Sequence, residues 1–167
     1  MKKLIIIIFS LMVITGLSAC DTDEIRSPEP PQQPENTGND NENENPQENM
    51  KMKITIGSTV FTATLENTAA ATAFKKLLPI TITMSELNNN EKYYSLPNSL
   101  PTNPTNPKTI QNGDLMLYGS QTLVLFYKSF STSYSYTRLG KVDDTTGLAS
   151  ALGAGNVAVT FESEQKE

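Results

Sequence analysis

The sequence predicts a mainly β domain over residues 51–167, a closed antiparallel barrel with two short helices. The unbroken apolar and aromatic run at 123–127 is bounded by polar residues on both sides, as a buried strand is. About eight short segments rich in strand formers recur along the domain, with turn residues between them. Closing that many short strands into a barrel removes the exposed edges of the sheet, which favours a barrel over an open sheet.

In chain order, the domain starts with a hairpin and a helix. Gly57-Ser58 separates two runs of strand formers and suits a tight two-residue turn. Thr68, or Asn67 before it, is placed to cap a helix whose apolar residues form one stripe, and Pro79 ends that helix. The expected bounds are 53–56 and 60–65 for the strands and 68–78 for the helix.

Two further strands and a proline-rich loop come next. Apolar residues alternate with threonine and serine over 80–85, which is the pattern of a half-buried strand. Asn88-Asn89-Asn90 suits a turn, after which 93–96 is expected to pair back on that strand. Four prolines within 97–107 predict a loop, because proline does not fit a central strand.

The last part of the domain predicts a central meander, a second helix and a closing strand. Three strand-like segments follow one another with short connections, and we expect them to lie side by side. Asp143 or Asp144 is placed to cap a short helix that includes Leu148, and Gly153 or Gly155 ends it. The expected strands are 115–118, 123–127 and 134–139 for the meander and 157–161 for the closing strand.

Composition excludes several classes of function. The formal net charge is −5, but half of the 18 acidic residues lie within 21–50, so the domain is close to neutral and offers no electrostatic reason to bind nucleic acid. One cysteine and no histidine exclude an intramolecular disulfide, Ser-His-Asp catalysis and zinc sites made of Cys or His. No acidic cluster in the domain has the spacing of metal ligands, so we expect neither a metal nor a cofactor.

The N-terminus has the three parts of a secretory signal. Met1-Lys2-Lys3 is positively charged, 4–17 is mostly apolar, and Leu17-Ser18-Ala19-Cys20 follows. This tetrapeptide resembles the lipobox of bacterial lipoproteins; an ordinary signal peptide with a chance cysteine is the alternative. The resemblance implies a signal peptide over 1–19, cleavage before Cys20, and several acyl chains such as palmitate on Cys20, which hold a protein stably on a membrane.

Residues 20–50 predict a disordered acidic tether behind the lipidated cysteine. Residues 21–49 contain five prolines, and Ile25 is their one large apolar residue, so this segment cannot bury enough surface to offset the entropy of ordering. Asp21-Thr22-Asp23-Glu24 resembles surface-export signals of some Gram-negative lipoproteins, whereas Asp21 alone resembles an inner-membrane retention signal of other bacteria. We expect a location in the bacterial cell envelope and favour the outer membrane or cell surface over the inner membrane.

Two short motifs resemble segments of the cyclophilins. Leu139-Gly140-Lys141-Val142, followed by an acidic turn and a helix, resembles a cyclophilin segment with Phe-Gly-Lys-Val, a turn and a helix. Gly119-Ser120-Gln121 and the apolar run after it resemble the Gly-Ser-Gln-Phe-Phe strand in the same register. Residues 51–162 as a whole resemble the small cyclophilin-like domains of bacterial lipoproteins, a group of unassigned function. The resemblance implies a cyclophilin-like barrel.

The same register implies a groove without a catalytic site. It places Gln121 on a glutamine beside the proline site, Leu123 and Ser131 on a phenylalanine and a tryptophan of the pocket, and Tyr136 on the histidine. Cyclophilins polarise the substrate imide with an arginine that has no counterpart here, since the domain's one arginine is Arg138 near its far end. Without that cation the twisted transition state lacks its electrostatic stabilisation. We therefore expect no catalytic residues.

Tyr134, Tyr136 and Arg138 would share one face of a strand by their spacing of two. Two phenols and a guanidinium suit recognition of an aromatic ring, a carboxylate or a peptide, and simple packing at the barrel rim is the alternative. With Gln121 and Leu123 they form the candidate binding groove. The expected function is a membrane-anchored, non-catalytic binding or interaction module for a peptide or small ligand. A weak peptidyl-prolyl isomerase for envelope proteins and a small-ligand carrier are the alternatives.

Overall fold

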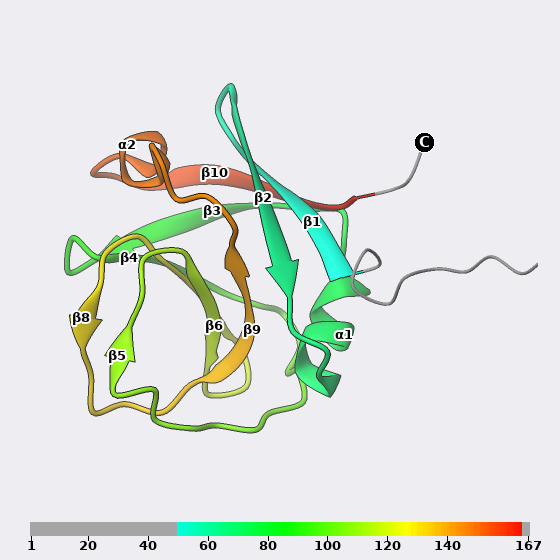
Figure 1. The fold of residues 1–167 in the computed structure, drawn as a ribbon. Coiled ribbons are helices and arrows are strands. Elements are labelled where there is room, and N and C mark those ends of the chain that lie inside the picture. The colour runs from blue at the N-terminus through cyan, green and yellow to red at the C-terminus, as the bar shows by residue number, and fades with distance from the viewer. Residues whose placement is uncertain (1–49, 165–167) are drawn as a thin grey trace, which may run out of the picture. The chain divides into compact units, whose positions relative to one another are not determined.

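A computed structural model describes residues 50–164, and it confirms the predicted mainly β, closed antiparallel barrel with two short helices. Eight strands close in the order β1-β10-β3-β4-β7-β6-β9-β2, and two short strands pair separately (Figure 1). The barrel strands are β1 (Lys51–Ile56), β2 (Thr59–Leu65), β3 (Ile80–Leu87), β4 (Glu91–Ser95), β6 (Asp114–Tyr118), β7 (Thr122–Phe126), β9 (Thr137–Val142) and β10 (Val157–Ser163). The separate pair is β5 (Thr109–Ile110) with β8 (Phe130–Ser131), and the helices are α1 (Ala69–Lys75) and α2 (Leu148–Leu152).

Alternation along each strand divides its side chains between the barrel interior and the outer surface. On β7, Leu123 belongs to the interior cluster, whereas Val124 belongs to a second cluster on the outer face. The interior cluster also includes Phe74 of α1, whose ring meets Phe161 of β10 edge-on with the centroids 5.8 Å apart. Full burial of each such side chain contributes roughly 1.5–3 kcal/mol, so this interior is the main source of stability.

The first hairpin and the first helix form where the sequence predicts them. Gly57 adopts a φ of 59° in the turn between β1 and β2. Thr68 caps α1, because its hydroxyl oxygen accepts a hydrogen bond from the Ala71 N–H at 3.2 Å. The α-helix ends at Lys75, earlier than expected, because the N–H of Leu77 bonds to a carbonyl only three residues back.

The second helix begins differently from the prediction. Its N-cap is Gly147, with a φ of 81°, and neither predicted aspartate caps it. Asp143 instead accepts a hydrogen bond from the Lys51 ammonium at 2.8 Å. Asp144 accepts one from the Thr146 N–H at 2.9 Å. Asp143 thus binds a side chain of β1, and Asp144 binds a backbone N–H two residues further on, before α2 starts.

The predicted central meander is wrong in its order. β6 lies between β7 and β9, and β7 pairs with β4 on its other side. The strand expected over 134–139 begins only at Thr137. Residues 134–136 remain in a loop, in which Tyr136 forms an isolated bridge with Thr105. Pairing with the proline-rich loop therefore replaces pairing within the barrel at this point.

A buried cation, Lys92 of β4, joins two parts of the barrel. Its ammonium donates hydrogen bonds to the Glu86 carboxylate and to the carbonyl oxygens of Gly153 at 2.8 Å and Gly155 at 2.6 Å. The Tyr127 hydroxyl donates to the same carboxylate at 2.8 Å. Burial acts to raise the pKa of Glu86, but the hydrogen bonds from Lys92 and Tyr127 and the Lys92 charge outweigh it and lower the pKa. The network ties β3 and β4 to the end of α2, which Gly153 terminates as predicted.

A second apolar cluster covers the outer face of β4, β7 and β6. Loop segments supply part of it, since Ile110 comes from β5 and Tyr136 from the segment after β8. These segments lie over the sheet instead of leaving its outer face in solvent. The buried members of the cluster are Ile110, Met116, Val124, Phe126 and Tyr136.

Candidate functional site

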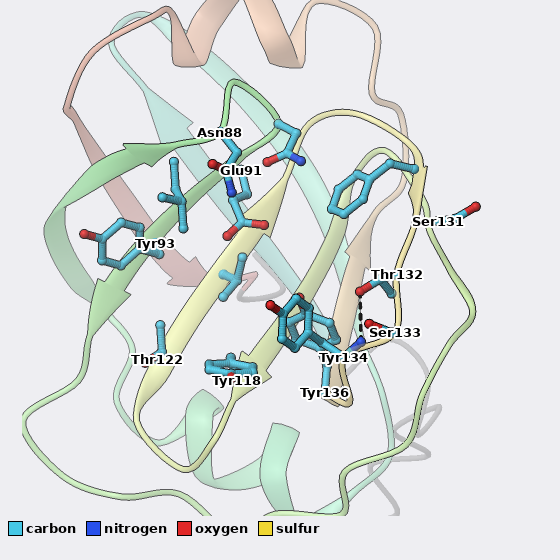
Figure 2. Close-up of a pocket in the computed structure, with 14 residues that line it drawn as sticks. Asn88, Glu91, Tyr93, Tyr118, Thr122, Ser131, Thr132, Ser133, Tyr134 and Tyr136 are labelled. Carbon is cyan, nitrogen blue, oxygen red and sulfur yellow. Dashed lines mark hydrogen bonds between the residues drawn. The ribbon is translucent and has the colours of Figure 1, made fainter.

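A pocket of about 490 Å³ opens on the outer face of β4, β6 and β7. Its floor is the sheet surface, where Val124 of β7 lies. The turn between β3 and β4, with Asn88, borders one side, and the segment between β8 and β9 borders another (Figure 2). We call it the tyrosine pocket, after Tyr93, Tyr118, Tyr134 and Tyr136, four of the six tyrosines of the chain.

The aromatic rings form one side of the pocket and leave their faces accessible. The ring centroid of Tyr118 lies 6.0 Å from that of Tyr134 and 5.7 Å from that of Tyr136. Tyr118 is 48% exposed and Tyr134 is 60% exposed, whereas Tyr136 is 7% exposed. Exposed aromatic faces beside a fixed ring attract apolar groups and cations.

Tyr136 is the fixed ring of this group. Its backbone N–H donates to the Thr105 carbonyl, and its carbonyl accepts from the Thr105 N–H, both at 2.9 Å. Its ring meets Phe126 edge-on, with the centroids 5.5 Å apart. Burial raises the pKa of the Tyr136 phenol, and the nearby Glu91 charge raises it further. The phenol therefore stays neutral at physiological pH.

Glu91 is the charged side chain of the tyrosine pocket. It starts β4 and lies opposite Phe126 of β7 on the outer face. Figure 2 shows its carboxylate between Tyr93 on one side and Tyr134 and Tyr136 on the other. Burial raises the pKa of this carboxyl, and the negative charge of Glu86 raises it further. Among the described residues it has no hydrogen-bond or ion-pair partner, so the carboxylate is free to accept one from a ligand.

Neutral hydrogen-bonding groups complete the rim. The Thr132 hydroxyl accepts a hydrogen bond from the Tyr134 N–H at 3.1 Å, which holds this turn (Figure 2). The Ser133 carbonyl accepts one from the Asn106 side chain at 2.8 Å. The segment before β9 is thus tied both to itself and to the proline-rich loop.

Three of the five residues of the predicted groove, Gln121, Leu123 and Arg138, lie outside the tyrosine pocket. Gln121 lies in the turn between β6 and β7, and its side-chain amide donates to the Leu96 carbonyl at 3.4 Å. Leu123 is fully buried in the barrel interior. Because side chains alternate along β7, its neighbours Thr122 and Val124 face the pocket instead.

Tyr134 and Tyr136 line the same pocket, but from a loop and not from the predicted strand, and Arg138 is separated from them. Arg138 lines a second pocket of about 370 Å³ beside α1, and its guanidinium lies 3.4 Å from Asp114. The backbone bridge between Thr105 and Tyr136 lies between the two pockets. Thr105 lines the pocket of Arg138, and Tyr136 lines the tyrosine pocket. Within the described part of the chain, no lysine or arginine lines the tyrosine pocket.

Glu91, Tyr93 and Tyr118 are pocket residues that the sequence analysis did not single out. Glu91 and Tyr93 are two residues apart, so in a strand they lie on one face, and this spacing could have predicted that they share a site. The position of Tyr118 depends on the pairing of β6 with both β7 and β9, which the predicted meander lacked.

The chemistry that these groups offer is recognition. The pocket combines aromatic faces, neutral hydroxyl and amide groups and one carboxylate. Residues 50–164 contain no group of three or more His, Cys, Asp or Glu side chains that could hold a metal ion. Aromatic faces attract apolar groups and cations, and the hydroxyl, amide and carboxylate groups can form hydrogen bonds with a ligand.

Comparisons with known proteins address the fold. The family model described as "Cyclophilin-like family" matches residues 54–162. A solved structure, the solution structure of a hypothetical protein from Archaeoglobus fulgidus, is similar with a TM-score of 0.57 at 16% sequence identity. That similarity covers 72% of this chain and 99% of the other. No curated protein matches the sequence significantly.

Proposed function

The chain belongs to the cyclophilin-like family, and on that premise we propose that it is a non-catalytic binding protein of the cell envelope. One observation carries the proposal: the tyrosine pocket is large, aromatic and lined by an unpartnered carboxylate. Its volume of about 490 Å³ lies within the range of small-ligand pockets, about 300–1,000 Å³. Tyr134 and Tyr136, two of the predicted groove residues, contribute to its wall.

A fragment titration tests whether ligands enter this pocket. We expect small aromatic and proline-containing peptide fragments to shift the NMR resonances of Tyr118, Tyr134 and Tyr136 in the full chain in non-ionic detergent. Thr122→Trp places a large ring in the pocket and should abolish these shifts. Thr62→Trp, at an exposed position of β2 outside the pocket, is the matched control and should leave them unchanged. If no fragment, neutral or cationic, perturbs the pocket, the proposed binding function fails.

The absence of a cation from the pocket supports the non-catalytic assignment. Prolyl isomerisation has a barrier of about 18–20 kcal/mol, and lowering it requires stabilisation where the imide nitrogen gains electron density. Arg138 is held beside Asp114 in the other pocket. We expect no acceleration over background in a coupled proline-isomer assay. Acceleration by several powers of ten that Arg138→Ala abolishes would instead establish the isomerase alternative.

The envelope location rests on the N-terminal sequence, which lies outside the described residues. No helix within residues 50–164 is long and apolar enough to cross a membrane. We propose lipid attachment at Cys20, followed by the tether over 20–50. Metabolic labelling with a palmitate analogue should mark the wild-type chain and not Cys20→Ala, whereas an unlabelled wild type would reject the anchor.

A further inference from the structure

The tyrosine pocket has a negative charge for which the surrounding domain supplies no counterion. Alternation along β4 turns the next residue, Lys92, into the barrel, where Glu86 and two carbonyl oxygens hold its ammonium. Lys128, two residues after the strand partner of Glu91, has its ammonium over the Tyr127 ring at 5.9 Å, and Arg138 lies against Asp114. The Glu91 carboxylate is therefore left to a partner from outside the described domain.

We propose that the tyrosine pocket binds organic ammonium cations, with Glu91 as the counterion and the tyrosine rings as the walls. This inference rests on the proposed binding function and names the chemical class of its ligand. The shared recognition element is an alkylated ammonium group, whether it belongs to a free amine or to a lipid headgroup.

Electrostatics favours a cation over an anion in this pocket. Glu91 is half-buried, and the pKa of its carboxyl is raised first by burial and then by the charge of Glu86, which is itself paired with Lys92. An anionic ligand would meet this charge without any lysine or arginine of the described residues to offset it. A cation instead offsets the cost of holding Glu91 ionised in a partly desolvated site.

The rings supply the second half of the recognition. An ammonium group placed over an aromatic face is attracted by the negative face of the ring, and alkylated ammonium groups gain most because they are weakly hydrated. Tyr118 and Tyr134 are exposed on this side, and Tyr136 remains a neutral phenol. Glu91 and Tyr136 line the same pocket, which places carboxylate and ring at one site, and the Glu91 charge adds to the effect of burial in raising the pKa of that phenol.

The size of the pocket limits the ligand further. A space of about 490 Å³ is larger than a bare ammonium ion needs, so the cation carries alkyl groups or an apolar body. Thr122 and the Ser131–Ser133 segment provide neutral hydrogen-bonding groups for a hydroxyl or amide on that body. Choline therefore suits the pocket in charge and polarity and serves as the probe for this class of ligand.

The test compares choline with its neutral isostere, 3,3-dimethylbutan-1-ol, by NMR titration of the full chain in non-ionic detergent. We expect choline to bind at least about tenfold more tightly, because the two probes differ in charge and hardly in shape. Glu91→Gln should weaken choline binding about tenfold or more and leave the neutral probe unchanged. Glu162→Gln, at an exposed position of β10, is the matched control and should change neither.

Substitutions of Tyr134 test the aromatic half. Tyr134→Phe keeps the ring face and should retain choline binding within about twofold, whereas Tyr134→Ala should lower the affinity several-fold. Because the Tyr134 side chain is exposed, neither substitution should unfold the domain, and a thermal melt of each variant checks that a loss of affinity does not come from unfolding. Two further probes distinguish a lipid headgroup from a free amine as the source of the ammonium group. Tighter binding of glycerophosphocholine indicates a lipid headgroup, and tighter binding of spermidine indicates a free amine.

Equal affinity for choline and its neutral isostere would overturn the cation proposal, as would unchanged choline binding by Glu91→Gln. In either case, pocket shifts with the neutral fragments would leave the proposed binding function standing. If neither fragments nor cations perturb the pocket, both proposals fail together.

Discussion

Gly140 is a position where the approach of two strands, and not an unusual φ, requires glycine. It pairs with Leu65 where β9 lies against β2. A Cβ at Gly140 would overlap the Thr64 carbonyl and would lie 2.9 Å from the Leu65 Cα. These are backbone atoms, which cannot rotate away as a side chain can. The glycine of the segment that resembles cyclophilins is therefore explained by packing between strands.

Gly140→Ala should lower the free energy of unfolding by about 1–3 kcal/mol, because the added methyl group forces β2 and β9 apart. Gly155→Ala is the matched control, since a Cβ there meets no atom within 4 Å. The control should stay within about 0.5 kcal/mol of the wild type. Urea denaturation followed by circular dichroism measures both, and equal stability of Gly140→Ala and wild type would contradict the packing argument.

The connection between α2 and β10 depends on a side chain of another element. Lys92 of β4 is completely buried, and its ammonium binds the carbonyl oxygens of Gly153 and Gly155. Its charge is balanced by Glu86 of β3, which also accepts a hydrogen bond from Tyr127. A polar network therefore fixes a segment that contributes few apolar side chains of its own.

Lys92→Met should destabilise the fold by about 3–5 kcal/mol, because it leaves the Glu86 carboxylate and two carbonyl oxygens without their donor. Lys53→Met, on the exposed side of β1, is the matched control and should stay within about 0.5 kcal/mol. Adding Glu86→Gln to Lys92→Met should recover part of the loss. Chemical denaturation of the four proteins gives these differences, and a stable Lys92→Met would show that the network contributes little.

Elements with local signals were predicted well, and those set by distant pairing were not. The Thr68 cap, the Gly57 turn and the alternation in β3 and β10 lie within a few neighbouring residues, so the sequence alone was sufficient. The spacing of Tyr134, Tyr136 and Arg138 also suggested one strand. Only Arg138 lies in β9, because Thr105, far away in the sequence, pairs with Tyr136.

The candidate site is a property of the whole barrel. β4, β6, β7 and the segment after β8 each contribute to the tyrosine pocket, and closure of the barrel brings them together. The sequence predicted the two tyrosines of one segment. It could not predict their combination with Glu91 of β4 and Tyr118 of β6, because that combination depends on the strand order.

The barrel should fold without the residues that precede it. Within the part of the chain that the structure describes, the interior cluster unites residues from seven of the eight barrel strands and from both helices, and Tyr94 of β4 packs against it. A fragment comprising residues 51–167 should melt cooperatively, within a few degrees of the chain that starts at Asp21. Differential scanning calorimetry compares the two, and a drop of many degrees would mean that residues 21–50 pack on the domain.

Closure of the barrel also determines where the tyrosine pocket lies relative to the two ends of the barrel sequence. β1 and β7 are opposite each other in the closed order of eight strands, and the first residues of β1 pair with the last residues of β10, as Met52 does with Ser163. The first residues of β1 and the last residues of β10 therefore lie on the part of the barrel opposite β7, which contributes to the floor of the tyrosine pocket. A domain coupled to a sensor chip through residue 51 or through residue 164 should therefore leave the pocket accessible, so ligand capture should not depend on which of the two is immobilised.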